Sequence, residues 1–177
     1  MRIVGGSLKG RVLCPFEKIG VRPTSDMTRE SIFNILQFRI AGAKFLDLFA
    51  GTGAVGIEAL SRGAKEVVLN DFSKESILLI KKNLDKLGIK EGVKVTSFDA
   101  VSLIEGGREK YDIIFIDPPY QSDLGNRVLK VISNSLADDG VAIFESDTSF
   151  QGEIQGLTIC DQRRYGKAHL TFFKKGE

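Results

Sequence analysis

Histidine and cysteine are scarce in this 177-residue sequence, which has one histidine and two cysteines. Cys14 and Cys160 lie far apart and form no CxxC pair. So few nitrogen and sulfur ligands argue against a zinc site, and we expect no metal cofactor. The spacing favours free thiols in a reducing compartment over a disulfide.

Long apolar runs are also missing. No stretch approaches the ~20 apolar residues of a membrane span, and the first six residues contain no apolar core of the signal-peptide type. A hydrophobic content of 42% and a charged content of 27% are ordinary for a globular protein. We therefore expect a cytoplasmic monomer with no membrane partner.

The small net charge of +2 is unevenly distributed. Residues 1–29 carry a net charge of +4, residues 160–177 carry +3, and the residues between them carry −5. Basic ends on an acidic body suggest a polyanionic partner that both ends contact. The alternative is a pattern that serves solubility alone.

Strand-like and helix-like segments alternate over most of the chain, which indicates an α/β fold with a parallel sheet covered by helices. The last two strand-like runs, 157–164 and 168–173, are separated by only three residues, so they should pair antiparallel. We expect a mostly parallel, Rossmann-like, seven-stranded sheet with a reversed strand near its C-terminal edge. The other predicted strands are 44–48, 66–70, 93–96, 111–116 and 141–145, and the predicted helices are 54–62, 74–87, 100–104 and 124–136.

The first 40 residues do not follow this alternation. Residues 2–4 and 11–13 flank a glycine-rich turn, which predicts a hairpin. Ser25 or Asp26 should cap a helix that reaches about Phe38. We expect its inward side chains to be Ile32, Ile35 and Leu36. The predicted organisation is an extension over residues 1–40 and a main domain over residues 41–177.

A glycine-rich turn, Asp47 to Gly56, follows the first strand of the main domain and contains the GxGxxG pattern between a strand and a helix. Glycines let the backbone turn tightly and approach a ligand closely. The alternative is that Gly51, Gly53 and Gly56 serve only close helix–strand packing.

Acidic residues follow the next two strands. Asp71 lies 20 residues beyond Gly51, where a carboxylate can accept hydrogen bonds from ribose hydroxyls. Asp99 and Ala100 end the third strand, near the expected position of an adenine edge. Alternatively, Asp71 is a plain surface acid and Asp99 a helix cap. These turns should line one crevice, because ligands of open α/β sheets bind at the carboxyl ends of the strands.

Two cofactor classes fit a glycine turn followed by an acid: dinucleotides and S-adenosylmethionine. An acid just before the glycines, Asp47, would repel a pyrophosphate at the helix N-terminus. The same acid would attract a sulfonium with an ammonium tail. The residues therefore favour S-adenosylmethionine, with S-adenosylhomocysteine as the product.

The run Asp117-Pro118-Pro119-Tyr120 follows the buried strand 111–116. Its prolines donate no backbone hydrogen bonds, so nearby carbonyls can accept them from a ligand. An acid, exposed carbonyls and an aromatic ring suit a flat group that bears an amine, such as a nucleobase. A plain proline turn is the alternative.

Several motifs together resemble a known family. Asp47 to Gly56 is similar to motif I of S-adenosylmethionine-dependent methyltransferases, and Asp117 to Tyr120 to motif IV of those that methylate exocyclic amines. Further segments recur in order, so that most of the chain up to about residue 145 resembles the RsmD-type 16S rRNA guanine-N2 methyltransferases. These segments are Met1 to Gly6, Lys9 to Arg11, Arg22 to Thr24, Arg29-Glu30, Phe33 to Leu36 and Glu58 to Ala64.

The resemblance implies methylation of one guanine N2 in 16S rRNA, within a 30S subunit or assembly intermediate, and an N-terminal segment that helps to bind RNA and cofactor. In this hypothesis Asp117 and the Pro118 carbonyl accept the amine N–H groups, and Tyr120 stacks on the base. The implied catalytic residues are Asp117, Pro118, Pro119 and Tyr120. The implied cofactor residues are Asp47, Phe49, Ala50, Gly51, Thr52, Gly53, Asp71, Phe72, Asp99, Ala100, Arg22 and Thr24. The implied RNA contacts are Arg2, Lys9, Arg11, Arg22 and Arg29.

Other interpretations stay open. Arg29 could instead be a helix-surface charge or a contact to the cofactor carboxylate, Tyr165 could pack on the core, and His169 is expected to be structural. Three positions, Met27, Asn70 and Ala168, depart from the family pattern. The competing functions are a DNA adenine-N6 methyltransferase, a protein-glutamine methyltransferase, a non-catalytic RNA-binding module and a dinucleotide oxidoreductase.

Overall fold

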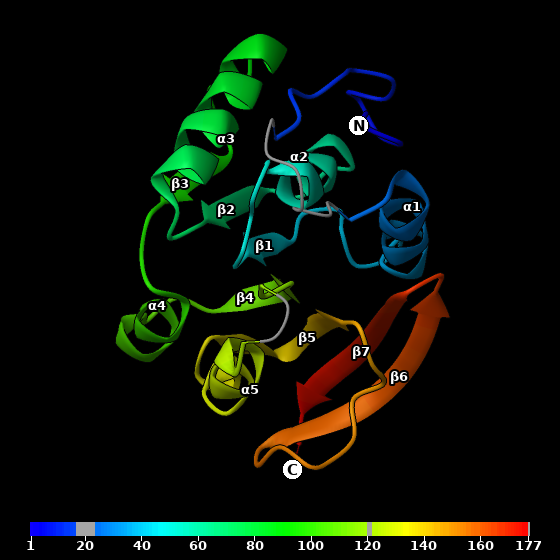
Figure 1. Ribbon diagram of the computed structural model, residues 1–177, viewed down its shortest axis with the longest axis vertical. Helices are drawn as coiled ribbons and strands as arrows, with labels where there is room; N and C mark the ends of the chain where they lie inside the picture. Colours follow the sequence, from blue (N-terminus) through cyan, green and yellow to red (C-terminus); the bar gives the residue numbers. More distant parts are fainter. Residues whose placement is uncertain (17–23, 120–121, 177) are drawn as a thin grey trace.

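A single mixed sheet forms the centre of the computed structural model, which describes residues 1–16, 24–119 and 122–176. Its seven strands have the order β3-β2-β1-β4-β5-β7-β6 (Figure 1). The first five are parallel, and β7 runs antiparallel to both β5 and β6, as the sequence predicted. The strands are β1 Lys44–Asp47, β2 Glu66–Asn70, β3 Val93–Thr96, β4 Tyr111–Ile116, β5 Leu136–Ser146, β6 Leu157–Tyr165 and β7 Ala168–Lys175.

Helices cover both faces of the sheet. Alternate strand residues point to opposite faces, so Phe45 belongs to one core and its neighbour Leu46 to the other. The first core includes residues of α1, α2 and α3, and the second includes residues of α4 and α5. The helices are α1 Asp26–Ile35, α2 Ala54–Ser61, α3 Lys74–Leu87, α4 Ala100–Gly106 and α5 Leu124–Leu129, with a 3-10 turn, η1, at Ile132–Asn134.

The predicted helix 124–136 was too long. In the structure α5 ends at Leu129, and only the short turn η1 follows it. Leu136 already pairs with Tyr111, so the chain must be extended at that point. For the same reason β5 begins earlier than predicted, with a shift of register between Tyr111 and Ile113.

Helix α1 was also predicted too long. Ser25 caps it, accepting a hydrogen bond from the Thr28 backbone N–H, but the helix ends at Ile35 instead of Phe38. Ile35 is exposed, whereas Phe33 is fully buried beside Ile32. The apolar face of α1 is therefore rotated by a small angle from the predicted one.

The N-terminal segment packs on α2. The predicted hairpin is present: Arg2 and Val12 form an antiparallel bridge, and the Ile3 N–H donates to the Arg11 carbonyl at 2.9 Å. Ile3 is fully buried in the core shared with α1, α2 and α3. The Glu58 carboxylate of α2 accepts hydrogen bonds from the backbone N–H groups of Val4 at 2.8 Å and Gly5 at 2.7 Å. The extension therefore shares its core with the sheet.

Two sequence expectations concern the chain as a whole. Both cysteines are free thiols, as predicted. Within the described ranges, no helix is long and apolar enough to cross a bilayer.

Candidate active site

The predicted cofactor and catalytic segments begin side by side at the carboxyl edge of the sheet. Asp47, the last residue of β1, pairs in register with Leu69 of β2 and Phe115 of β4. Asp71 and Asp117 each lie two residues beyond those partners. The Leu48 N–H donates to the Phe115 carbonyl at 3.0 Å. The glycine turn and the acid-proline segment thus leave adjacent strands at the same edge.

The glycine turn has a backbone shape that only glycine adopts readily. Gly51 has φ +55° and Gly53 has φ +81°, in the left-handed region that L side chains rarely occupy. The Gly53 N–H closes the turn by donating to the Ala50 carbonyl at 2.7 Å. Gly56 has a different role, because a Cβ built there would lie 2.2 Å from Leu69 Cδ2. Close helix–strand packing therefore explains Gly56, and turn geometry explains the first two glycines.

The Asp71 carboxylate fixes this turn. One oxygen accepts the Gly51 N–H at 2.8 Å, and the other accepts the Ser73 N–H at 2.9 Å. Each carboxylate oxygen has a second lone pair, so Asp71 can still accept a ligand hydroxyl. Its neighbour Phe72 is 76% exposed, which leaves an aromatic face open beside the carboxylate.

Asn70 joins three strand ends and was not recognised as a site residue from the sequence. Its buried amide donates to the carbonyls of Leu48 at 3.2 Å and Phe98 at 3.0 Å. Its side-chain oxygen accepts hydrogen bonds from the Thr96 hydroxyl and the Phe98 N–H. An apolar residue at this position could make none of these bonds. The polar residue at the end of an apolar strand was the available signal.

Asp47 lies beneath the glycine turn. It is 1% exposed and accepts the Gly56 N–H, in the first turn of α2, at 3.0 Å. Burial raises the pKa of Asp47 to about 7, and the nearby Asp71 carboxylate adds to the rise. A cation bound near this edge would favour the ionised form of Asp47.

Asp99 caps α4. Its carboxylate accepts hydrogen bonds from the backbone N–H and the hydroxyl of Ser102, both at 2.9 Å. The backbone hydrogen bond is the main reason that the pKa of Asp99 is lowered. The helix-cap interpretation therefore holds, and binding of an adenine edge stays a prediction. Phe98, which is 57% exposed, is a further aromatic side chain here that the sequence had not indicated.

Asp117 lies in an acidic pair with Glu145, the penultimate residue of β5. The Thr24 hydroxyl lies 3.4 Å from Asp117 Oδ2 and 3.3 Å from Glu145 Oε2, so it joins the two carboxyl groups. Burial raises the pKa of Asp117 well above its ordinary value, and the charges of Glu145 and Asp47 raise it further. Glu145 is 5% exposed. Its position at a strand end was the signal that could have identified it.

The other predicted ligand residues lie along the same edge. Pro118 is half-buried and Pro119 is exposed, and the Pro119 carbonyl accepts the Ser122 hydroxyl at 2.7 Å. Phe49 is half-buried against the second core. Two predicted residues, Arg22 and Tyr120, lie outside the described residues. The side chains of Ala50, Thr52 and Ala100 are buried, so a ligand would meet mainly the backbone at these positions.

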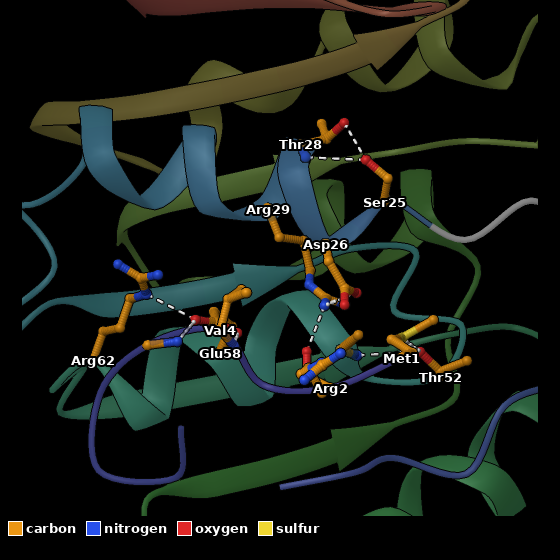
Figure 2. A network of polar contacts seen from close by, with 12 residues as sticks. Met1, Arg2, Val4, Ser25, Asp26, Thr28, Arg29, Thr52, Glu58 and Arg62 are labelled. Atoms are coloured by element: carbon orange, nitrogen blue, oxygen red, sulfur yellow. Dashed lines mark hydrogen bonds and ion pairs between the residues drawn. The ribbon is translucent and has the colours of Figure 1, made fainter. Parts of the chain in front are cut away.

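The prediction that Arg29 contacts RNA is wrong. Its side chain is fully buried, and its terminal nitrogen donates to the Arg2 carbonyl at 2.6 Å and to Asp26 at 2.7 Å (Figure 2). Burial lowers the pKa of Arg29. Arg29 therefore joins α1 to the N-terminal segment and is not a helix-surface charge either. A contact to the cofactor carboxylate stays a prediction.

The other predicted RNA contacts, Arg2, Lys9 and Arg11, are exposed. The Leu8 N–H beside Lys9 donates to Ser61, the last residue of α2, and Arg11 donates to the carbonyl of Lys86 near the end of α3. Both helices begin at the carboxyl edge and run back across the sheet. Lys9 therefore lies toward the edge opposite Asp117. Arg11 lies nearer the glycine turn, since Asn83, one helical turn before Lys86, donates to the Thr52 carbonyl at 2.9 Å.

The sheet order and the ligand-type turns at its carboxyl edge define a Rossmann-like α/β protein of the class I methyltransferase type. An Escherichia coli structure, "Putative methyltransferase yhhF", superposes with a TM-score of 0.85 at 28% identity, covering 99% of this chain and 97% of that one. The crystal structure of SMU.776, "a putative methyltransferase complexed with SAH", shares the fold at a TM-score of 0.72 and 18% identity, over 88% of this chain and 51% of that one.

Sequence comparison gives the family. The family model described as "Conserved hypothetical protein 95" matches residues 1–174. The Bacillus subtilis protein "Putative rRNA methyltransferase YlbH" is 33% identical over 182 residues, 99% of each chain. Ribosomal RNA small subunit methyltransferase D of Escherichia coli is 36% identical over 150 residues, 83% of this chain and 75% of the relative. The chain therefore belongs to this family, the RsmD-type methyltransferases.

Proposed function

We propose that this protein transfers a methyl group from S-adenosylmethionine to the N2 amine of one guanine in small-subunit ribosomal RNA. The observation that carries the proposal is the hydrogen bond between Leu48 and Phe115, since it places the start of the glycine turn beside Asp117. The names of the E. coli and B. subtilis relatives support ribosomal RNA as the substrate class.

The residues at the edge fit S-adenosylmethionine better than a dinucleotide. Asp47 and Asp71 lie on the two sides of the glycine turn, and negative charge there favours a cationic ligand over a pyrophosphate. The free lone pairs of Asp71 suit ribose hydroxyls, and the exposed ring of Phe72 offers a face to a purine. The bound cofactor would supply an electrophilic methyl group.

The protein's contribution to the reaction is chiefly positioning. A guanine amine is a poor nucleophile because its lone pair is delocalised into the ring. Hydrogen bonds from its two N–H groups to Asp117 and the Pro118 carbonyl would hold the lone pair toward the methyl group. Alignment of this kind is effective, since well-oriented reactants reach effective molarities of ~10⁵–10⁸ M.

Asp117 also has the chemistry to accept a proton. The nitrogen gains a methyl group and loses one proton, and the ionised Asp117 carboxylate takes that proton in this proposal. Its raised pKa makes it a better base than an ordinary aspartate. The Thr24 hydroxyl, with a single proton, can donate to Asp117 or to Glu145 but not to both at once.

The test is methyl transfer from labelled S-adenosylmethionine to three substrates: undermethylated 30S particles, naked 16S rRNA and duplex DNA. The expected result is label in N2-methylguanosine after digestion of the ribosomal RNA to nucleosides. Label in N6-methyladenine of DNA would support the DNA methyltransferase instead. Calorimetric binding of S-adenosylmethionine without transfer would indicate a non-catalytic module, and binding of NAD alone would indicate an oxidoreductase.

A further inference from the structure

The turn between β6 and β7 lies at the same edge of the sheet as Asp117. Ile116, just before Asp117, pairs with Phe144 of β5, and Ser146 at the end of β5 pairs with His169 of β7. His169 in turn pairs with Arg164 of β6. The hairpin turn that follows Arg164 is therefore at the carboxyl edge, at the hairpin end nearer α1 in Figure 1.

Three basic side chains, Arg163, Arg164 and Lys167, are exposed at this turn. The Nε atom of Arg163 donates to Asp161 at 2.9 Å, and that of Arg164 donates to the Gly166 carbonyl at 3.0 Å. Each guanidinium has four further N–H groups on its terminal nitrogens. Those groups suit the bidentate recognition of a phosphate.

The turn is also firmly supported. Tyr165 is half-buried and packs against the first core, which favours the packing interpretation of this residue. Tyr165 lies between Arg164 and Lys167 in the sequence, so its packing holds the backbone that carries these two charges in place. The ion pair between Arg163 and Asp161 joins two partly exposed side chains, and such pairs contribute little and exchange readily for another anion.

The geometry points to RNA phosphates as the ligand of this turn: we propose that Arg163, Arg164 and Lys167 bind the RNA backbone next to the target base. This inference rests on the proposed function, since a base that reaches Asp117 must bring its flanking phosphates to the same edge. The turn is better placed for this than Lys9, which lies toward the opposite edge.

The test uses two double variants that remove equal charge from the two ends of one hairpin. Arg164→Gln with Lys167→Gln alters the turn, and Lys174→Gln with Lys175→Gln alters the far end of β7. Leaving Arg163 in place keeps the partner of Asp161. The first readout is the affinity for a 16S rRNA fragment between 50 and 200 mM salt, because each lost phosphate contact lowers the salt slope by ~0.7 for single strands.

We expect the turn variant to bind RNA about tenfold more weakly at low salt, with a salt slope lower by about 1.4. The far-end variant should bind like the wild type. S-adenosylmethionine affinity by calorimetry, thermal unfolding and kcat at saturating RNA should be unchanged in both, while KM for RNA rises only in the turn variant.

Equal RNA affinity in the turn variant and the far-end variant would overturn the inference, as would wild-type RNA binding that does not depend on salt. This failure is distinguishable from failure of the proposed function. If only the inference about the turn fails, the wild type still methylates ribosomal RNA. If the proposed function fails, the wild type binds S-adenosylmethionine but yields no N2-methylguanosine, whatever the RNA affinity of the turn variant.

Discussion

Thr24 and Asp117 are 93 residues apart in the sequence, yet the Thr24 hydroxyl lies 3.4 Å from the Asp117 carboxylate. The contact brings the segment before α1 onto the edge where β4 ends. A hydroxyl that donates to a carboxylate stabilises its ionised form, so this bond lowers the pKa of Asp117, against the effects of burial and neighbouring charge.

Replacement of Thr24 should therefore change the pH dependence of catalysis. In Thr24→Val the hydroxyl is lost, so the pKa of Asp117 rises further and the acid limb of the kcat/KM profile for methyl transfer moves to higher pH. Thr24→Ser keeps the hydroxyl and should restore the wild-type profile. A purely structural role for Thr24 predicts the same profile in both variants.

Replacement of Glu145 should shift the same profile in the opposite direction. The Glu145 charge raises the pKa of Asp117, so Glu145→Gln lowers that pKa and moves the acid limb to lower pH. Glu153→Gln, an exposed acid in the segment between β5 and β6, is the matched control and should leave the limb in place. If the acid limb of Glu145→Gln stays in place or moves to higher pH, the two carboxyl groups do not interact.

Asp47 should make stability fall as pH rises. Its pKa is raised to about 7 by burial, so the folded protein holds this proton more tightly than the unfolded chain, and ionisation costs stability between about pH 4 and 7. A shift of this size corresponds to about 4 kcal/mol. Relative to the wild type, the free energy of unfolding of Asp47→Asn should therefore rise by up to that amount between pH 4.5 and 8.

Urea unfolding at both pH values measures this difference. Asp85→Asn, on the exposed side of α3, is the control and should show little change with pH relative to the wild type. A difference between Asp47→Asn and the wild type that stays constant with pH would mean that Asp47 is ionised at every pH tested.

Gly56 should tolerate no side chain. A Cβ at this position would lie 2.2 Å from Leu69 Cδ2 and 3.0 Å from Val67 Cγ1, and overpacking of this kind typically costs ~1–3 kcal/mol. Gly106→Ala is the control, because nothing lies within 4 Å of its Cβ position. Chemical denaturation should show a clear loss of stability for Gly56→Ala and almost none for Gly106→Ala.

Much of the fold followed from the sequence, because local signals decided it. The apolar runs predicted the first and last residues of β2, β3 and β4, and Ser73 and Gly88 predicted the two ends of α3. The sequence failed where a distant contact determined the outcome. The pairing of Leu136 with Tyr111, for example, shortened α5.

The placement of the candidate site residues could be predicted to a similar extent. The glycine turn, Asp71 and Asp117 were recognisable because each follows a strand at a known offset. The sequence does not show which charged side chains are buried. Arg29 was therefore predicted to be a surface contact, although its guanidinium lies beneath the N-terminal segment. Asn70 and Glu145 were missed because their roles depend on neighbouring strand ends, and only the order of the strands brings those ends together.

The central claim is that Asp117 and the glycine turn work as one methyl-transfer site. The most direct test is the single-turnover rate of methyl transfer to ribosomal RNA by Asp117→Ala, measured beside calorimetric affinity for S-adenosylmethionine. We expect a rate at least ~100-fold lower with cofactor affinity unchanged. A near-normal rate in this variant, with the cofactor still bound, would contradict the account.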